Sequence, residues 1–265
     1  MRATFEKIKP VELAVAAMVR RQLAFEKGAL LGAGVKVGPK QFPRVFELSR
    51  VCADTLGISP PTVYVVSNHT LNAMTFGTND DSFVVLHSAL VDHLSDTELL
   101  DVIGHECGHI HNDHVVYLTT LHLLNQIAMV APVPYLRFVV FPAMLALNAW
   151  QRRAEVTSDR AGLLCSKDLE AATRTLAKLA VGSQKLFEQL NLEAFLSQYE
   201  ETRDSPGKFK ELFAPHPFLP KRIMALKIFS ESALYRKHAG LGDDGKPMQQ
   251  VDDLVNDIVR VVELG

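Results

Sequence analysis

Two histidines and a glutamate form the pattern H-E-x-x-H within an apolar, helix-forming run from Leu99 to Leu118. On a helix, residues four apart share a face, so His105 and His109 can direct their imidazoles at one metal ion. Glu106 lies beside that face, where its carboxylate can reach a water molecule on the metal. The pattern fixes few positions and the chain has 10 histidines, so its interpretation depends on the rest of the sequence.

The start of this helix is marked by the segment Ser95-Asp96-Thr97-Glu98. A serine followed three residues later by a glutamate is a capping box, in which each side chain bonds the backbone N–H of the other residue. The helix is therefore predicted to begin at about Asp96.

Three further side chains near the pattern have no predicted part in metal binding. His111 and His114 are predicted to point away from the face of His105 and His109, towards the surface or an outer layer. Cys107 also faces elsewhere on the helix and is predicted to pack as a small apolar residue.

The composition is that of a folded protein. Of the 265 residues, 48% are apolar and 22% are charged, which suits one large domain or two small ones. The net charge of -2 leaves no basic stripe, so nucleic acid is not a predicted partner. The three cysteines form no C-x-x-C pair, which is typical of a reducing compartment. Residues 1–9 contain no short apolar segment, which predicts no signal peptide and a cytoplasmic location.

The fold is predicted to be mainly α with a small antiparallel β-sheet (α+β). Stretches rich in Val, Tyr and Phe indicate strands at 62–67 and 82–87, with a third strand over 72–77 between them. The glycine-rich stretch 28–40 lacks the spacing of a phosphate-binding loop and is predicted to be a flexible connector. Helices are predicted over 11–27, 41–56, about 142–165, 168–180, 183–199, 218–237 and 251–264, with an exposed loop over 200–214 and a linker over 240–247.

The segment 115–150 is almost uncharged, with Arg137 as the exception, and it contains three prolines. A single membrane span needs about 20 apolar residues, so two spans would barely fit in this length. The segment is predicted to form a buried or surface-associating helical hairpin. Insertion into a membrane and contact with a membrane surface stay open as alternatives.

A catalytic zinc normally has three protein ligands and one position open to water, so a third ligand is needed. The metzincin pattern H-E-x-x-H-x-x-G-x-x-H is excluded, because Asn112 and Val115 occupy its Gly and third His positions. Glu155 and Asp159 are four apart on a predicted helix and face the same way. Glu155 could bind the metal while Asp159 accepts the second ring N–H of a ligating histidine. Taken alone, an E-x-x-x-D pair is better explained as two solvated helix acids.

The motifs together carry a family resemblance. H-E-C-G-H followed by E-V-T-S-D resembles the HtpX-like and CAAX-prenyl-protease-type zinc metallopeptidases, the gluzincins of metallopeptidase family 48. Asn72 to Gly77 resembles that family's N-A-x-x-x-G strand, and His216-Pro217 with Arg222-Ile223 resembles its H-P-x-x-x-R-I segment. The motifs occur in the family's order and cover about residues 60–230.

The resemblance implies a zincin-like metallopeptidase domain with one Zn²⁺ per chain, held by His105, His109 and Glu155. Zinc lowers the pKa of its bound water towards 7, and Glu106 would be the general base that passes the proton to the leaving amine. His216 is the candidate donor to the oxyanion, with capping of the following helix as the equal alternative.

The resemblance also implies roles around the metal and for the substrate. Arg222 would pair with an acid such as Asp159. The strand containing Asn72 and Ala73 would offer its edge to an extended polypeptide, which is the implied substrate.

The predicted organisation is N-terminal helices over 1–57, the zinc metallopeptidase domain over 58–240 with its hairpin over 115–150, and a linker with an amphipathic helix over 241–265. The predicted function is that of a zinc-dependent metalloendopeptidase, cytoplasmic or associated with a membrane. Two alternatives are a catalytically silent zinc-binding scaffold and an integral membrane protease.

Overall fold

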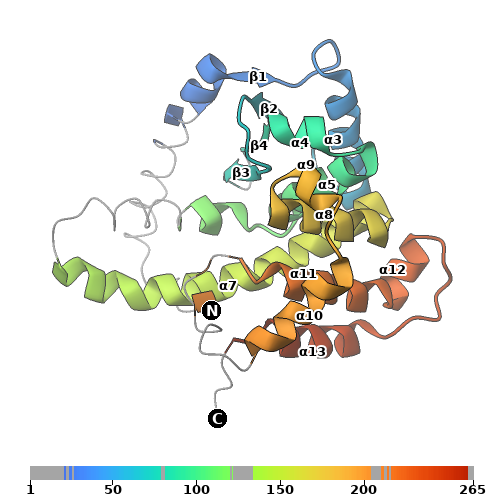
Figure 1. Cartoon of the computed structure of the whole chain (residues 1–265). Helices are drawn as coiled ribbons and strands as arrows, with labels where there is room; N and C mark the ends of the chain where they lie inside the picture. Colours follow the sequence, from blue (N-terminus) through green and yellow to red (C-terminus); the bar gives the residue numbers. More distant parts are fainter. Residues whose placement is uncertain are drawn as a thin grey trace.

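The computed structural model describes residues 21, 24–25, 27–78, 81–119, 121, 134–203, 210–211, 214 and 216–261; of 134–144, 199 and 201–203 it describes the backbone alone. Most of the predicted helix 11–27, and residues 122–133 of the predicted hairpin, therefore lie outside the described residues. The described chain is mainly helical with one small sheet, as predicted (Figure 1).

Four short strands form the sheet, in the order β1-β2-β4-β3. They are β1 (Gly34–Lys36), β2 (Thr62–Val66), β3 (Ala73–Gly77) and β4 (Ser82–His87). The β1–β2 and β3–β4 pairs are antiparallel, but β2 and β4 run parallel, so the sheet is mixed and the antiparallel prediction is wrong for its central pair. The reason is topological: β3 takes the outer edge, and the chain returns as β4 between β2 and β3.

The glycine-rich stretch 28–40, which is predicted to be a flexible connector, instead contains regular secondary structure. Residues 27–33 are helical and β1 follows directly. A Cβ on Gly34 would lie 3.1 Å from the Leu30 carbonyl oxygen and 3.1 Å from Val66 Cγ1, so glycine permits the close approach of β1 to β2.

Helices α3 (Pro43–Leu56), α4 (Ser88–His93) and α5 (Asp96–His111) pack beside and beneath the sheet. Helix α5 begins at the predicted residue, and both halves of the capping box are formed. The Ser95 hydroxyl accepts from the Glu98 N–H at 3.4 Å, and the Glu98 carboxylate accepts from the Ser95 N–H at 2.8 Å. Lys178, from the later helix α8 (Leu169–Val181), also donates to the buried Glu98 at 2.9 Å.

Helix α7 (Pro134–Ser166) is 33 residues long and crosses the middle of the molecule (Figure 1). It begins at Pro134, about eight residues earlier than predicted, and Pro142 lies inside it without ending it. Within the described ranges, none of the helices combines the length and the apolar character that crossing a bilayer requires.

Glycines bring α5 and α7 close together. A Cβ on Gly108 would lie 2.7 Å from the Ala161 Cβ, and one on Gly104 would lie 2.8 Å from the Cys165 Cβ. On the other helix, a Cβ on Gly162 would lie 2.6 Å from the Asp101 carbonyl oxygen. No larger residue fits at these three positions unless the helices separate.

The apolar core lies on both sides of α7. On one side, α3, α4, α5, β2 and β4 enclose a cluster that includes all three cysteines, which are free and buried. Cys107 packs there, as predicted. On the other side, α7 and α8 pack against α11 (Leu219–Ser230), α12 (Ala233–His238) and α13 (Met248–Val259).

The C-terminal half contains more breaks than the sequence predicts. The predicted helix 183–199 is divided into α9 (Gln184–Phe187) and α10 (Leu192–Arg203), and the predicted helix 218–237 into α11 and α12. Ser232 makes the second break, because its hydroxyl caps α12 by accepting from the Tyr235 N–H. The predicted loop 200–214 is not wholly exposed, since Glu211 is fully buried and pairs with Lys221 at 2.7 Å. The division at residues 57 and 241 stays a prediction.

The contact at Gly108 predicts a specific effect on stability. We expect Gly108→Ala to lower the free energy of unfolding by about 1–3 kcal/mol, the usual cost of overpacking. Gly32→Ala is the matched control, because Gly32 is helical and has no heavy atom within 4 Å of an added Cβ, so that change should be neutral or stabilising. Urea unfolding of the three proteins measures this, and equal stability of Gly108→Ala and the wild type would contradict the close packing.

Candidate metal centre

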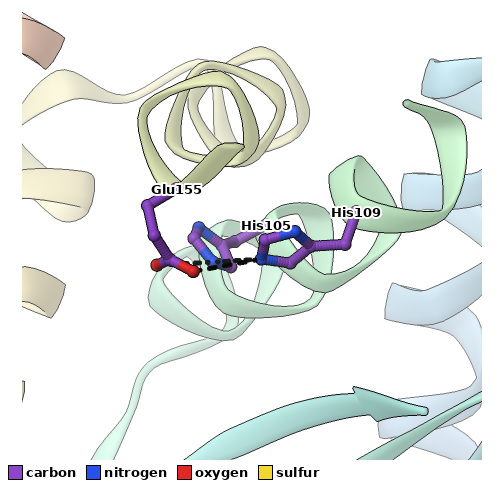
Figure 2. A group of neighbouring side chains, drawn as sticks. All are labelled: His105, His109 and Glu155. Atoms are coloured by element: carbon purple, nitrogen blue, oxygen red, sulfur yellow. Dashed lines mark hydrogen bonds and ion pairs between the residues drawn. The ribbon is translucent and has the colours of Figure 1, made fainter. Parts of the chain in front are cut away.

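Three donor side chains converge where α5 and α7 meet (Figure 2). The Nε2 atoms of His105 and His109 are 3.2 Å apart. The Glu155 carboxylate approaches them from α7, with Oε2 3.6 Å from His105 Nε2 and Oε1 3.5 Å from His109 Nε2. His109 and Glu155 are buried and His105 is partly buried. Within the described residues, this is the one group of His, Cys, Asp and Glu side chains with the spacing of a metal site.

The spacing suits a tetrahedral zinc ion. Zinc binds nitrogen and oxygen ligands at about 2.0–2.2 Å, so any two ligand atoms of a tetrahedral site are about 3.3–3.5 Å apart. The nearest atoms of the three side chains are 3.2, 3.5 and 3.6 Å apart, close to this range, with the two histidines nearest to different oxygens of the Glu155 carboxylate. Two histidines and one glutamate are also a donor set that catalytic zinc sites use. The residues present therefore fit the metal.

The second ring nitrogen of His105 is held by Asp159, one helical turn after Glu155. His105 Nδ1 lies 2.9 Å from Asp159 Oδ1, which leaves Nε2 facing the other donors. Arg222, from α11, binds Asp159 with two N–H groups at 2.5 and 2.8 Å and lies 3.4 Å from Glu155. Arg222 thus pairs with Asp159 as the sequence predicts, and it ties α11 to both acids of α7.

The charges around the three donors favour a cation. Burial raises the pKa of Glu155, but the charge of His216, hydrogen bonds from His109 and His216, and the charge of Arg222 together hold it well below its ordinary value. Burial likewise raises the pKa of Asp159, and its contacts with Arg222 and His105 lower it overall. Both acids are therefore ionised at neutral pH.

The same field acts on His105. Burial lowers the pKa of this imidazole, but its hydrogen bond to Asp159 and the charge of Glu155 raise that pKa to about 9. A negative potential that favours a proton on His105 also favours a metal cation at the same place.

Glu106 is buried on α5 next to the two histidines, and the sheet holds its carboxylate. The Thr75 hydroxyl, from β3, donates to Glu106 Oε2 at 2.5 Å and is 3.3 Å from the Glu106 carbonyl oxygen. Thr75 is not among the residues predicted from the sequence. Its position in the predicted edge strand was the only available signal, and the strand pattern does not indicate what its side chain contacts.

The two residues predicted for the substrate strand lie where β3 begins. Ala73 is the first residue of β3, and the Asn72 carbonyl oxygen accepts from the His87 N–H at 3.1 Å. Because β3 is the last strand in the sheet order, its second edge pairs with no other strand of the described sheet.

His216 reaches the site from the segment before α11. Its Nδ1 is 2.8 Å from Glu155 Oε2, and its side chain is 54% exposed, so it stands at the rim. Helix α11 has Phe218 as its N-cap residue and no side-chain cap, so His216 does not cap it. Arg152 and Glu211 anchor this segment: Arg152 donates to the Glu211 and Ala214 carbonyl oxygens at 3.0 and 3.2 Å, and Glu211 accepts from the Phe218 N–H at 2.9 Å.

The prediction that His114 points away from the ligand face is wrong. Its Nδ1 lies 3.2 Å from Nδ1 of His109, in a buried position. Helix α5 ends at His111, and Asp113 adopts a positive φ of 58°, so the chain turns back and helical spacing does not apply. Asn112-Asp113 was the available signal, because Asn and Asp tolerate the left-handed region. Burial and the charge of His109 lower the pKa of His114 to about 4. His111 is exposed, as predicted.

Comparisons with known proteins identify the family of this chain. Residues 39–229 match the family described as Peptidase family M48. A plastoglobule-localized metallopeptidase 48 of chloroplasts from Arabidopsis thaliana is 34% identical over 186 residues, which are 66% of this chain and 52% of that protein. The chain thus spans about half the length of that relative.

The chain is also similar to two further proteins. A protease HtpX homolog from Tropheryma whipplei is 26% identical over 225 residues, which are 75% of this chain and 76% of that protein. The crystal structure of Ste24p from S. mikatae aligns with a TM-score of 0.46 at 18% identity, covering 82% of this chain and 56% of that one. The match to the family extends over more than half of the sequence, from α3 to α11, and includes every residue of the candidate centre. This chain therefore belongs to peptidase family M48.

Proposed function

We propose that this peptidase is a zinc-dependent metalloendopeptidase, with one Zn²⁺ per chain held by His105, His109 and Glu155. The observation that carries the proposal is the convergence of these three side chains, from two helices, with 3.2–3.6 Å between their nearest donor atoms, close to the separations of tetrahedral zinc ligands. The donor set indicates which metal ion is preferred. Imidazole and carboxylate ligands suit zinc, whereas calcium and magnesium sites are built from oxygen ligands.

Zinc, when bound, supplies Lewis acidity that acidifies water and polarises the scissile carbonyl group. Glu106 is the proposed general base, because it follows a metal ligand directly on α5 and is held inside the site. Thr75 donates to Oε2 of Glu106, which leaves Oε1 as the oxygen that takes the proton from water and passes it to the leaving amine. The Thr75 contact thus sets the orientation of the base.

His216 stays the candidate donor to the oxyanion. Its exposed ring at the rim of the site can reach a substrate, and with Nδ1 directed at Glu155, Nε2 is the nitrogen that would donate. The anchoring of its segment by Arg152 and Glu211 supports a fixed position for this ring.

The edge of β3 supports a polypeptide substrate in extended form. A peptide that pairs with this edge, near Asn72 and Ala73, gains affinity from backbone hydrogen bonds. Such pairing does not depend on a chain terminus, which favours an endopeptidase. Thr75 lies in the same strand, so the substrate edge and the general base share one element.

A catalytically silent zinc-binding scaffold and an integral membrane protease are the two alternatives. A purely structural zinc site has no use for a general base, so the buried contact between Glu106 and Thr75 favours the enzyme. The segment 115–150 is the part of the chain through which contact with a membrane surface would occur. A cytoplasmic location is proposed because the three cysteines are free thiols.

The metal site predicts that Glu155→Ala loses zinc. Loss of an outer hydrogen-bond partner lowers metal affinity by up to about 100-fold, and removal of a ligand itself should lower zinc affinity by more than that. Zinc affinity is measured by competition with a chromophoric chelator, and Glu170→Ala is the control, because Glu170 is a solvated helix acid with 82% side-chain exposure. If Glu155→Ala binds zinc with the affinity of the wild type, Glu155 is not the third ligand and another residue is.

The mechanism predicts that Glu106→Gln retains zinc and loses activity. Cleavage of unfolded casein by the zinc-loaded protein should fall by about 10²–10⁴-fold, the usual contribution of a general acid–base group. A zinc chelator should abolish wild-type cleavage, and Glu47→Gln, on the exposed face of α3, should cleave normally. If Glu106→Gln cleaves casein as fast as the wild type, the assigned base is wrong, and a zinc-loaded wild type without cleavage would favour the scaffold.

A further inference from the structure

We propose that His114 is a positioning residue that holds the ring of His109 in the orientation and tautomer required for binding the metal. This inference rests on the proposed function, because it concerns the same zinc site. The observation behind it is the 3.2 Å separation between Nδ1 of His114 and Nδ1 of His109, in a buried position.

The ring proton of His109 has one possible position when this histidine binds the metal. Its Nε2 faces His105 and Glu155 and must give its lone pair to the metal, so the ring proton lies on Nδ1. A buried N–H requires an acceptor, and His114 Nδ1 lies within hydrogen-bond distance of it. His114 therefore accepts at Nδ1 and carries its own proton at Nε2. Each imidazole then has one defined tautomer.

The two metal-binding histidines have different outer partners. His105 is bound by the carboxylate of Asp159, the kind of partner that ligating histidines usually have. His109 is bound by a neutral ring acceptor instead. An imidazole is a weaker acceptor than a carboxylate, but it adds no further carboxylate to a site that already contains Glu106, Glu155 and Asp159.

The fold provides a specific place for His114. The turn at Asp113 reverses the chain, and the His114 N–H donates to the His109 carbonyl oxygen at 2.9 Å. Trp150, from α7, meets the His114 ring edge to face, with ring centroids 5.2 Å apart and planes at 87°. The same tryptophan packs against Tyr117 at 4.9 Å. Helix α7 thus contributes one candidate metal ligand, Glu155, and supports a second, His109, through Trp150 and His114.

The test compares three substitutions by zinc affinity, measured by competition with a chromophoric chelator on the full chain. His114→Phe keeps an aromatic ring against Trp150 and removes the acceptor. His114→Asn is the conservative variant, because its side-chain oxygen is attached to Cγ, as Nδ1 is in histidine, and it can accept in the same place. His111→Phe is the matched control, since His111 is exposed at the end of α5, three residues before His114. Circular dichroism and the emission of Trp150, the one tryptophan in the sequence, show whether each variant is folded.

We expect His114→Phe to bind zinc about 10–100-fold more weakly, the usual cost of losing an outer partner of a ligating histidine. His114→Asn should recover most of this loss, and His111→Phe should bind like the wild type. If His114→Phe does not fold, His114→Ala takes its place, with the same expected loss.

Two results would overturn the inference. One is wild-type affinity in the variant without an acceptor; the other is a loss in His114→Asn as large as in His114→Phe, which would assign the effect to packing. Both leave the proposed function intact, because the wild type still binds zinc in each. A folded wild-type chain that binds no zinc would instead overturn the proposed function, and this inference with it.

Discussion

The close approach of α5 and α7 is the constraint on which the candidate site depends. Gly104 and Gly108 each directly precede one of the two metal-binding histidines, and a Cβ on either glycine would clash with α7. The glycine face and the histidine face of α5 are adjacent, so glycine contact with α7 brings His105 and His109 towards Glu155. A wider spacing would move the Glu155 carboxylate away from both imidazoles, and the donor separations near 3.5 Å would be lost.

The charge of Arg222 stabilises the two carboxylates that packing brings to the site. Two ionised carboxylates on consecutive turns of α7 would repel each other in a buried site, and Arg222 from α11 offsets that repulsion by binding Asp159 and approaching Glu155. The positive charge of Arg222 offsets one of the two carboxylate charges, and the other is available to the metal ion. The site therefore joins the two core clusters on either side of α7, with ligands from α5 and α7 and charge compensation from α11. The β3 strand adds Thr75, which holds the proposed base.

The sequence predicts those parts of the site that follow helical periodicity. Residues 105, 106 and 109 share one helix whose start is marked by Ser95 and Glu98, and Glu155 and Asp159 are one turn apart on another helix. Local spacing therefore indicated which side chains share a face, and the family resemblance was needed to single out Glu155 and Asp159. Their meeting in space is a long-range contact, and it was expected from the family resemblance rather than from the helices themselves.

What the sequence did not predict depends on contacts between distant segments or on single backbone angles. The parallel pairing of β2 with β4 follows from the position of β3 at the edge, which no local pattern encodes. His114 was misplaced because one positive φ at Asp113 ends the helical spacing. Glu211 was assigned to an exposed loop because its polar surroundings in sequence do not reveal its burial against Lys221.

The most direct test of the account is a crystal structure of the zinc-loaded protein, with anomalous diffraction recorded on both sides of the zinc absorption edge. The account predicts one anomalous peak per chain, at about 2.0–2.2 Å from Nε2 of His105, Nε2 of His109 and a carboxylate oxygen of Glu155. A zinc ion bound through Nδ1 of either histidine, or one located away from the junction of α5 and α7, would contradict it.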